Sequence, residues 1–209
     1  MICISYEEAR PLMKPGDVIA FGGKARFSSL IKLITMGNVS HVGTILQTKV
    51  VDDNTGRFFN QLIESTLHDD VNGVIISRFS DVIAAYPGDI WWLPIDRTKP
   101  FNQEAFFDFL FDQARAKKPY DLAQALKSAV DLIDMFDKNT EDFSKFFCSE
   151  LVAAGFEKAG LVSHVNASEV TPIDLCRWRI FEDDYYLLKG DSEKEISRHN
   201  STAPVQEII

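Results

Sequence analysis

The stretch "SHVGTILQTKVVDDNTGRFFNQLIEST", Ser40 to Thr66, decides the fold. Its two ends, residues 40–50 and 57–66, are rich in the β-branched and aromatic residues that favour strands. Between them, "VDDNTG" is dense in residues that form turns. We therefore expect the two segments to pair as an antiparallel hairpin.

The register of this hairpin decides which side chains share a face. If Val50 pairs with Arg57 around the turn, Glu64 lies opposite Gly43 and one pair away from His41. Residues His41 and Gly43 point to the same side because side chains alternate along a strand. The hairpin therefore predicts that Glu64 and His41 share a face, and a slip of one residue would separate them.

Outward from the hairpin, strand patterns are followed by helix patterns. A Pro-Gly-Asp turn leads into an apolar run twice, at Pro15 and again at Pro87. The further predicted strands are 17–23, 73–79, 87–95 and 184–190, and the predicted helices are 5–13, 26–37, 102–118, 121–136 and 145–160. Strands first and helices second predict an α+β domain with a largely antiparallel sheet. We expect one domain over residues 1–190 and a polar, peripheral C-terminal extension over 191–209.

Composition excludes several classes of protein. The net charge of −9 argues against nucleic acid as a partner, because phosphate binding needs an excess of Lys and Arg. Glycine-rich phosphate loops such as GxGxxG are absent from the sequence, so no nucleotide cofactor is expected. The N-terminal residues resemble neither a secretory signal nor a transmembrane segment, which predicts a cytoplasmic protein. Three cysteines without CxxC spacing and four scattered histidines predict neither disulfides nor a metal site.

Cys148 is the first candidate for chemistry. It lies in "KFFCSELVAAGFEKAG", Lys145 to Gly160, on the apolar stripe of the predicted helix and in its first turn. There the helix dipole would favour a thiolate, and backbone N–H groups could form part of an oxyanion hole. The alternative is a small buried core residue, which is the commoner role of cysteine.

A nucleophilic thiol needs a base, and His41 is the histidine best placed for that role. Gly43, its neighbour on the same strand face, leaves space beside the imidazole. Glu64 is the one acid in an otherwise apolar strand, and it could orient His41 from the other ring nitrogen. The alternatives are a structural histidine and a surface carboxylate on an edge strand.

The order of motifs carries a family likeness. A "PGD" strand, "SHVG", "IES", "PYD" and "FFCSELV", spread over residues 14–160, resemble the YiiX/YaeF-type permuted papain-fold amidases. Those enzymes belong to the NlpC-type cysteine peptidase superfamily and are related to lecithin:retinol acyltransferase. In the permuted order the histidine strand precedes the cysteine helix, as His41 precedes Cys148 here.

The resemblance implies a permuted papain-like fold and roles for four residues. Cys148 would be the nucleophile, His41 the base and then the acid, Glu64 the orienting group, and Tyr120 of "KPYD" a donor to the oxyanion. The substrate would be a peptide, another amide or an acyl lipid, and residues 123–144 could form a lid. Three functions stay open: an amide hydrolase, a lipid-directed acyltransferase or esterase, and a noncatalytic binding or virion-associated module.

Overall fold

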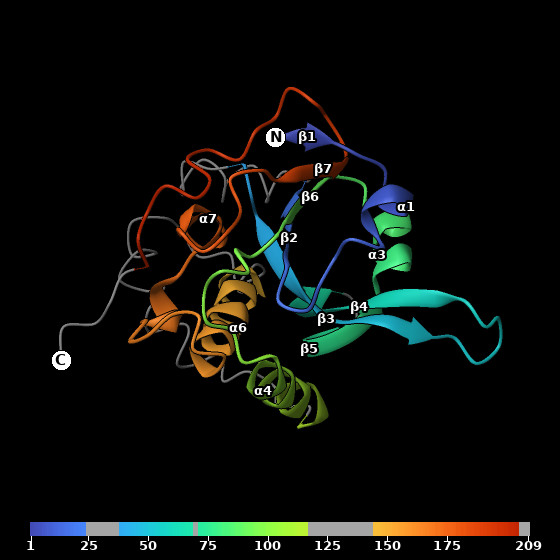
Figure 1. Ribbon diagram of the computed structural model, residues 1–209, viewed down its shortest axis with the longest axis horizontal. Coiled ribbons are helices and arrows are strands. Elements are labelled where there is room, and N and C mark those ends of the chain that lie inside the picture. Colours follow the sequence, from blue (N-terminus) through green and yellow to red (C-terminus); the bar gives the residue numbers. More distant parts are fainter. Residues whose placement is uncertain (24–37, 69–70, 117–143, 205–209) are drawn as a thin grey trace.

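The computed structural model describes residues 1–23, 38–68, 71–116 and 144–204, and these form a mixed α/β structure around a seven-stranded sheet (Figure 1). The strand order across the sheet is β1-β7-β6-β2-β3-β4-β5. The strands are β1 (Ile2–Cys3), β2 (Val18–Gly22), β3 (His41–Val51), β4 (Phe58–His68), β5 (Val71–Arg78), β6 (Asp89–Leu93) and β7 (Tyr186–Lys189). The helices are α1 (Tyr6–Ala9), α3 (Phe79–Ala85), α4 (Gln103–Arg115), α6 (Ser144–Lys158) and α7 (Pro172–Arg177), with a 3₁₀ turn at Ala167–Glu169.

The expected antiparallel sheet is confirmed. Every strand pair is antiparallel except β1 with β7, which runs parallel at one edge. The hairpin of β3 and β4 lies within one or two residues of the predicted segments, because the turn formers of "VDDNTG" end both strands. The other predicted strands correspond to β2, β5, β6 and β7.

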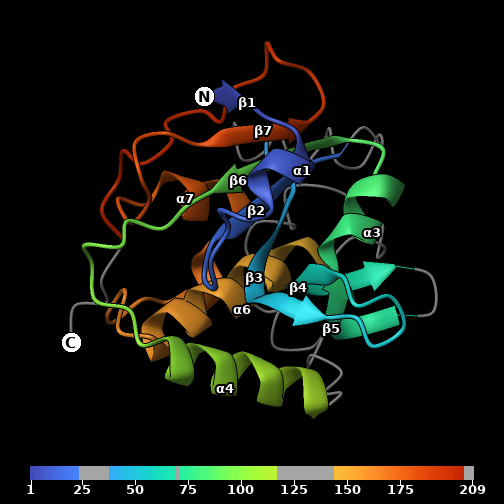
Figure 2. The ribbon, with the colours of Figure 1, turned by 45° about the vertical axis from the view of Figure 1, so that its right-hand side comes forward.

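Two apolar clusters occupy opposite faces of the sheet, as side-chain alternation requires. On β2, Val18 and Ala20 belong to the larger cluster, whereas Ile19 and Phe21 belong to the smaller one. Helices α4, α6 and α7 contribute to the larger cluster, and α1 and α3 cover the smaller one. Figure 2 shows α6 and α4 on one side of the sheet and α1 and α3 on the other.

Helix α3 was not predicted from the sequence. Its signal is the spacing of Phe79, Val82, Ile83 and Tyr86, which belong to or pack against the smaller cluster. The strand pattern of β5 runs directly into Phe79, so the change from a period of two to a helical period falls without a Gly or Pro to mark it. Helix α7 and strand β1 are also findings of the structure alone.

Asp17 of the first Pro-Gly-Asp turn is a buried hub. Its carboxylate accepts hydrogen bonds from the Lys14 N–H at 2.9 Å, the Trp92 Nε1 at 2.9 Å and the Ile95 N–H at 3.3 Å. It also forms an ion pair with Arg97. A buried carboxylate needs such partners, so this turn ties β2 to the chain that follows β6.

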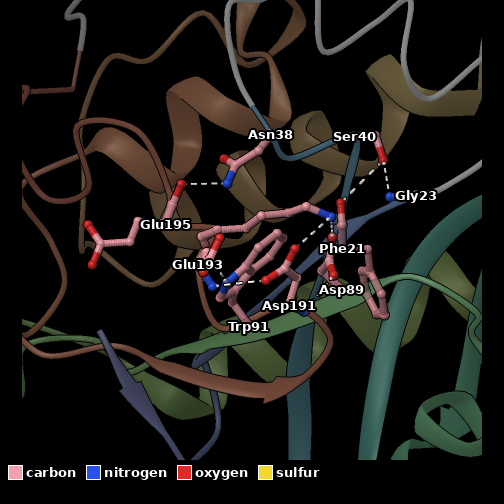
Figure 3. Close-up of polar contacts among 10 residues, drawn as sticks. Phe21, Gly23, Asn38, Ser40, Asp89, Trp91, Asp191, Glu193 and Glu195 are labelled. Carbon is pink, nitrogen blue, oxygen red and sulfur yellow. Dashed lines mark hydrogen bonds and ion pairs between the residues drawn. The ribbon is translucent and has the colours of Figure 1, made fainter.

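Residues 191–204, the described part of the C-terminal segment, make contacts with the sheet, although the polar composition of 191–209 predicts a peripheral extension. Asp89 of the second Pro-Gly-Asp turn is fully buried, and Lys194 reaches it with Nζ 3.0 Å from Oδ2. The Asn38 Nδ2 donates to the Glu195 carbonyl oxygen at 2.5 Å (Figure 3). Ile196 is buried in the larger cluster. An ion pair, a backbone hydrogen bond and one apolar side chain thus connect to the sheet a segment that has no hydrophobic period.

Several expectations concern residues outside the described ranges. They include the helices predicted over 26–37 and 121–136, Tyr120, and the lid predicted over 123–144, of which only Ser144 is described, as the first residue of α6. Within the residues that the structure describes, no helix combines the length and hydrophobicity needed to span a membrane.

Candidate active site

The β3–β4 ladder brings Glu64 to the face that carries His41. Thr44 pairs with Ile63, and continuing this register by one residue sets Gly43 opposite Glu64. A Cβ placed on Gly43 would lie 3.2 Å from the Glu64 Cβ and 3.0 Å from the Ile63 carbonyl oxygen. The backbone of Gly43 therefore lies close against β4, on the strand face that also carries His41 and Glu64.

The register near the turn differs from the prediction. Val50 pairs with Phe59 instead of Arg57, a slip of two residues. Two irregularities, one on each side of the Gln47–Gln61 pair, then shift the ladder by one residue each. Such bulges are common in antiparallel ladders, and together they restore the predicted register at the His41 end. The placement of Glu64 was right, but the pairing from which it was deduced was wrong.

His41 and Glu64 are in direct contact. The His41 Nε2 lies 2.6 Å from the Glu64 Oε2, and the two side chains are 17% and 11% exposed. With the carboxylate as acceptor, the Nε2–H donates this hydrogen bond. The Nδ1 atom is then the ring nitrogen left for another partner.

Cys148 is the other group that interacts with His41. Burial lowers the pKa of the His41 imidazolium, but charge and hydrogen-bond interactions with Cys148 and with Glu64 oppose it and raise the pKa to about 10. The imidazole thus interacts with both a thiol group and a carboxylate. A proton can be held on His41 at neutral pH because both neighbours carry or can carry negative charge.

The contact joins the two faces of the sheet. Phe21, the direct strand partner of His41, belongs to the smaller apolar cluster, whereas Cys148 belongs to the larger one on the other face. His41 is the first residue of β3, so its ring lies where the strand begins and can meet a residue from the opposite layer. Sequence patterns place residues on faces but cannot show that two faces meet at a strand end.

Cys148 lies deeper in its helix than expected. Helix α6 begins at Ser144, so Cys148 is its fifth residue and starts the second turn instead of lying in the first. No Gly or Pro stands between Asp142 and Cys148 to stop the helix from extending upstream of the apolar stripe. The influence of the helix dipole falls off beyond the first turn, so the expected effect of the dipole on Cys148 is weaker than the sequence indicates.

The apolar stripe of α6 is buried as predicted, and Cys148 is part of it. The Cys148 side chain has no exposed surface, and neighbouring Ser149 donates a hydrogen bond from Oγ to the Val170 carbonyl oxygen at 2.5 Å. That bond ties α6 to the segment that follows the 3₁₀ turn. Among the described residues, no group of three or more His, Cys, Asp or Glu side chains is arranged to hold a metal ion.

The structure thus brings together three of the four residues singled out from the sequence: Cys148, His41 and Glu64. The fourth, Tyr120, lies outside the described residues. A fully buried second thiol, Cys176 of α7, lies close enough to Cys148 for the two to interact electrostatically. Nothing in the local sequence around Cys176 indicates this proximity, because it depends on how α7 packs against α6.

The fold and the site define a mixed α/β protein with a cysteine, a histidine and a glutamate in contact. No protein-family model matches the chain. No curated protein matches it in sequence. Among solved structures, the metalloprotein YiiX from Escherichia coli O157:H7 is similar with a TM-score of 0.45 and 18% sequence identity, over 73% of this chain and 69% of that one. The roles of the three residues do not rest on this likeness.

Proposed function

We propose that the protein is a cysteine hydrolase that cleaves an amide bond, in a peptide or an N-acyl compound, through Cys148, His41 and Glu64. The observation that carries the proposal is that the His41 ring interacts with two groups, the Glu64 carboxylate at 2.6 Å from Nε2 and Cys148. A nucleophile, a base and a group that orients the base are the parts that acyl transfer to a thiol requires.

The reaction follows from these positions. The reaction starts from the ion pair in which the Cys148 proton is already on His41; the thiolate sulfur bonds to the carbonyl carbon, and the carbonyl π electrons move to the oxygen. When the C=O bond re-forms, the C–N bond breaks and the amine leaves with the proton from His41. A water molecule, deprotonated by His41, then attacks the thioester, which releases the carboxylic acid and restores the thiol. Glu64 keeps the imidazole oriented and stabilises its positive charge throughout.

The donors for the oxyanion come from elsewhere than the Cys148 backbone. In a regular α-helix the N–H of the fifth residue bonds to the carbonyl of the first, so the Cys148 N–H is engaged within α6. The proposed donor is therefore a side chain, and Tyr120 is the candidate that the family resemblance supplies. A transfer of acyl groups from lipids would use the same three residues and differs only in the leaving group and the acceptor.

A noncatalytic binding module is the second candidate, and one observation favours it: the Cys148 thiol is fully buried. In that case Cys148 would react like any buried thiol. The chain contains a matched control, because Cys176 is equally buried and burial strongly raises its pKa. Cys3, which is exposed, supplies the reference for an ordinary accessible thiol.

The test compares the three thiols in one protein. Native protein is treated with iodoacetamide at neutral pH, and the labelling rate of each cysteine is followed by peptide mass spectrometry. If the protein is a cysteine hydrolase, Cys148 should be labelled at least about tenfold faster than Cys176, because the thiolate is the reactive form of a cysteine. The variant His41→Gln should remove this advantage. Equal labelling rates for Cys148 and Cys176 would contradict activation of the Cys148 thiol and would favour the noncatalytic binding module.

The second test measures the turnover of candidate substrates. Peptide amides, N-acyl amino acids and acyl-lipid esters are offered in parallel, and product release is compared between the native chain and Cys148→Ala. Loss of the nucleophile should reduce amide turnover by about 10³-fold or more. Activity on lipid esters alone would point to the acyltransferase or esterase, and full amide activity in Cys148→Ala would refute the proposal.

A further inference from the structure

Ser40 stands directly before His41, where one of the two ladders of β3 has already stopped. The β2–β3 ladder continues as far as the pair of Phe21 with His41. The β3–β4 ladder, by contrast, ends at the pair of Thr44 with Ile63. The backbone of His41 is therefore held from the side of β2, at the last pair of a ladder, and such ends are the first places to fray.

The Ser40 hydroxyl closes the β2–β3 ladder beyond its last pair. Ser40 is 1% exposed, and its Oγ donates to the Phe21 carbonyl oxygen at 3.2 Å and accepts from the Gly23 N–H at 3.1 Å (Figure 3). The Ser40 N–H donates to the same Phe21 oxygen at 2.9 Å. A side chain thus supplies the bonds that a further backbone pair would otherwise make.

The end of β2 to which Ser40 is bonded is itself firmly packed. Phe21 is buried and pairs with Ile90 of β6 on its other side. A Cβ on Gly22 would lie 2.7 Å from the Trp91 ring, so the backbone of β2 passes close against that ring. Close-packed segments of this kind have little room to shift. Ser40 is therefore bonded to a strand end that can hold the start of β3 in place.

Phe21 also supports His41 with its side chain. The centroids of the Phe21 and His41 rings lie 5.3 Å apart, with the ring planes tilted by 44°. A backbone shift at Ser40 would move the imidazole relative to this ring and to the Glu64 carboxylate, whose Oε2 lies 2.6 Å from the His41 Nε2. A hydrogen bond weakens when its distance and angle depart from these values.

We infer that Ser40 is a positioning residue of the site, which fixes the start of β3 and so keeps the His41 imidazole in contact with Glu64. For its consequence in catalysis, the inference rests on the proposed function. The hydroxyl acts through its bonds to the backbone of β2 and takes no part in the bond changes of the reaction.

The first test removes the hydroxyl and keeps the backbone bond. In Ser40→Ala, the N–H of residue 40 can still donate to Phe21, but both bonds of the hydroxyl are lost. The His41 ring is then held less firmly on Glu64, so the His41 pKa measured by NMR should fall by roughly half a unit, which is within the effect of one neutral hydrogen bond. The pH midpoint of Cys148 alkylation by iodoacetamide should rise by roughly half a unit, because a nearby imidazolium favours the thiolate.

Thr44→Val is the matched control. Thr44 is fully buried on the same strand, and its Oγ1 donates to the Asp17 carbonyl oxygen at 3.1 Å. That oxygen also accepts from the Ile45 N–H at 2.8 Å. The arrangement repeats that of the Ser40 hydroxyl, but at the other end of β2. Thr44→Val should therefore lower the urea midpoint to an extent comparable with Ser40→Ala and leave the His41 pKa and the alkylation midpoint unchanged.

A second measurement needs no substitution. In the native protein the Ser40 Oγ should protect the Gly23 N–H, so this amide should exchange its hydrogen more slowly than a glycine amide in an unfolded chain. Slow exchange at Gly23 supports the closed ladder even where Ser40→Ala does not fold. Exchange at the unfolded rate would overturn the inference, because the bond that closes the ladder would then be missing.

The outcomes separate this inference from the proposed function. If Ser40→Ala matches Thr44→Val in both the His41 pKa and the alkylation midpoint, the positioning role is overturned, whatever the amide assay shows. If Cys148→Ala keeps full amide turnover, the hydrolase fails, and the NMR titration still decides whether Ser40 positions His41. A urea unfolding curve for each variant ensures that only folded proteins are compared.

Discussion

Replacing Glu64 by glutamine should lower the pKa of His41, and the structure indicates by how much. The substitution keeps an acceptor oxygen near the His41 Nε2, now 2.6 Å from the Glu64 Oε2, but removes the negative charge. A hydrogen bond to a charged group contributes about 1.5–3 kcal/mol, against about 0.5–1.5 kcal/mol for a neutral one. The difference of about 1–1.5 kcal/mol corresponds to about one pKa unit. The His41 pKa should therefore fall from about 10 in the native chain to about 9 in Glu64→Gln.

The assay is an NMR titration of the histidine Cε1–H signals. His41→Gln identifies the His41 signal, and exposed His164 serves as an internal reference that the substitution should not move. Cys148→Ala should also lower the His41 pKa, because the thiol is the other group that raises it. A His41 signal that titrates near 6.5 in the native protein, or that is unchanged in Glu64→Gln, would refute the reasoning.

Three further substitutions test packing around the site, each by urea unfolding. Gly43→Ala should lower the free energy of unfolding by about 1–3 kcal/mol and weaken the His41–Glu64 contact, because the new Cβ would lie 3.0 Å from a backbone oxygen of β4. An unchanged urea midpoint would contradict this. Asp17→Ala should lower the free energy of unfolding by about 3–5 kcal/mol, because Arg97 loses its carboxylate partner at a buried site. A loss of less than about 1 kcal/mol would contradict a structural role for the Asp17 contacts. Ile196→Ala should cost about 2–5 kcal/mol if the C-terminal segment belongs to the core, whereas an effect within about 0.5 kcal/mol would fit a peripheral extension.

Local patterns were most informative where apolar side chains recur at the spacing of an element. Along β3, Val42 and Leu46 belong to the larger cluster and Ile45 to the smaller one, and the helical stripe around Cys148 is buried. The placement of Glu64 on the face of His41 was deduced from an expected Val50–Arg57 pair, and it is correct only because two irregularities restore that register at the His41 end. The predicted pairing of Val50 was wrong near the turn, because the irregularities in the ladder are not visible in the sequence pattern.

Boundaries and distant contacts were less predictable. Helix α6 starts upstream of its apolar stripe, because a helix extends through any residues that do not break it. The C-terminal segment is polar, yet Ile196 and the buried Asp89 tie it to the sheet. A single anchoring side chain has no period and cannot be recognised as such in a sequence.

The sequence by itself determined the antiparallel hairpin, the buried stripe of the Cys148 helix and the three residues worth testing, because each depends on the spacing of neighbours along the chain. Only the tertiary structure decided that the His41 ring interacts with both Cys148 and Glu64. These interactions join residues from opposite faces of the sheet at the start of β3. They arise from packing between segments far apart in the chain, which no local periodicity encodes.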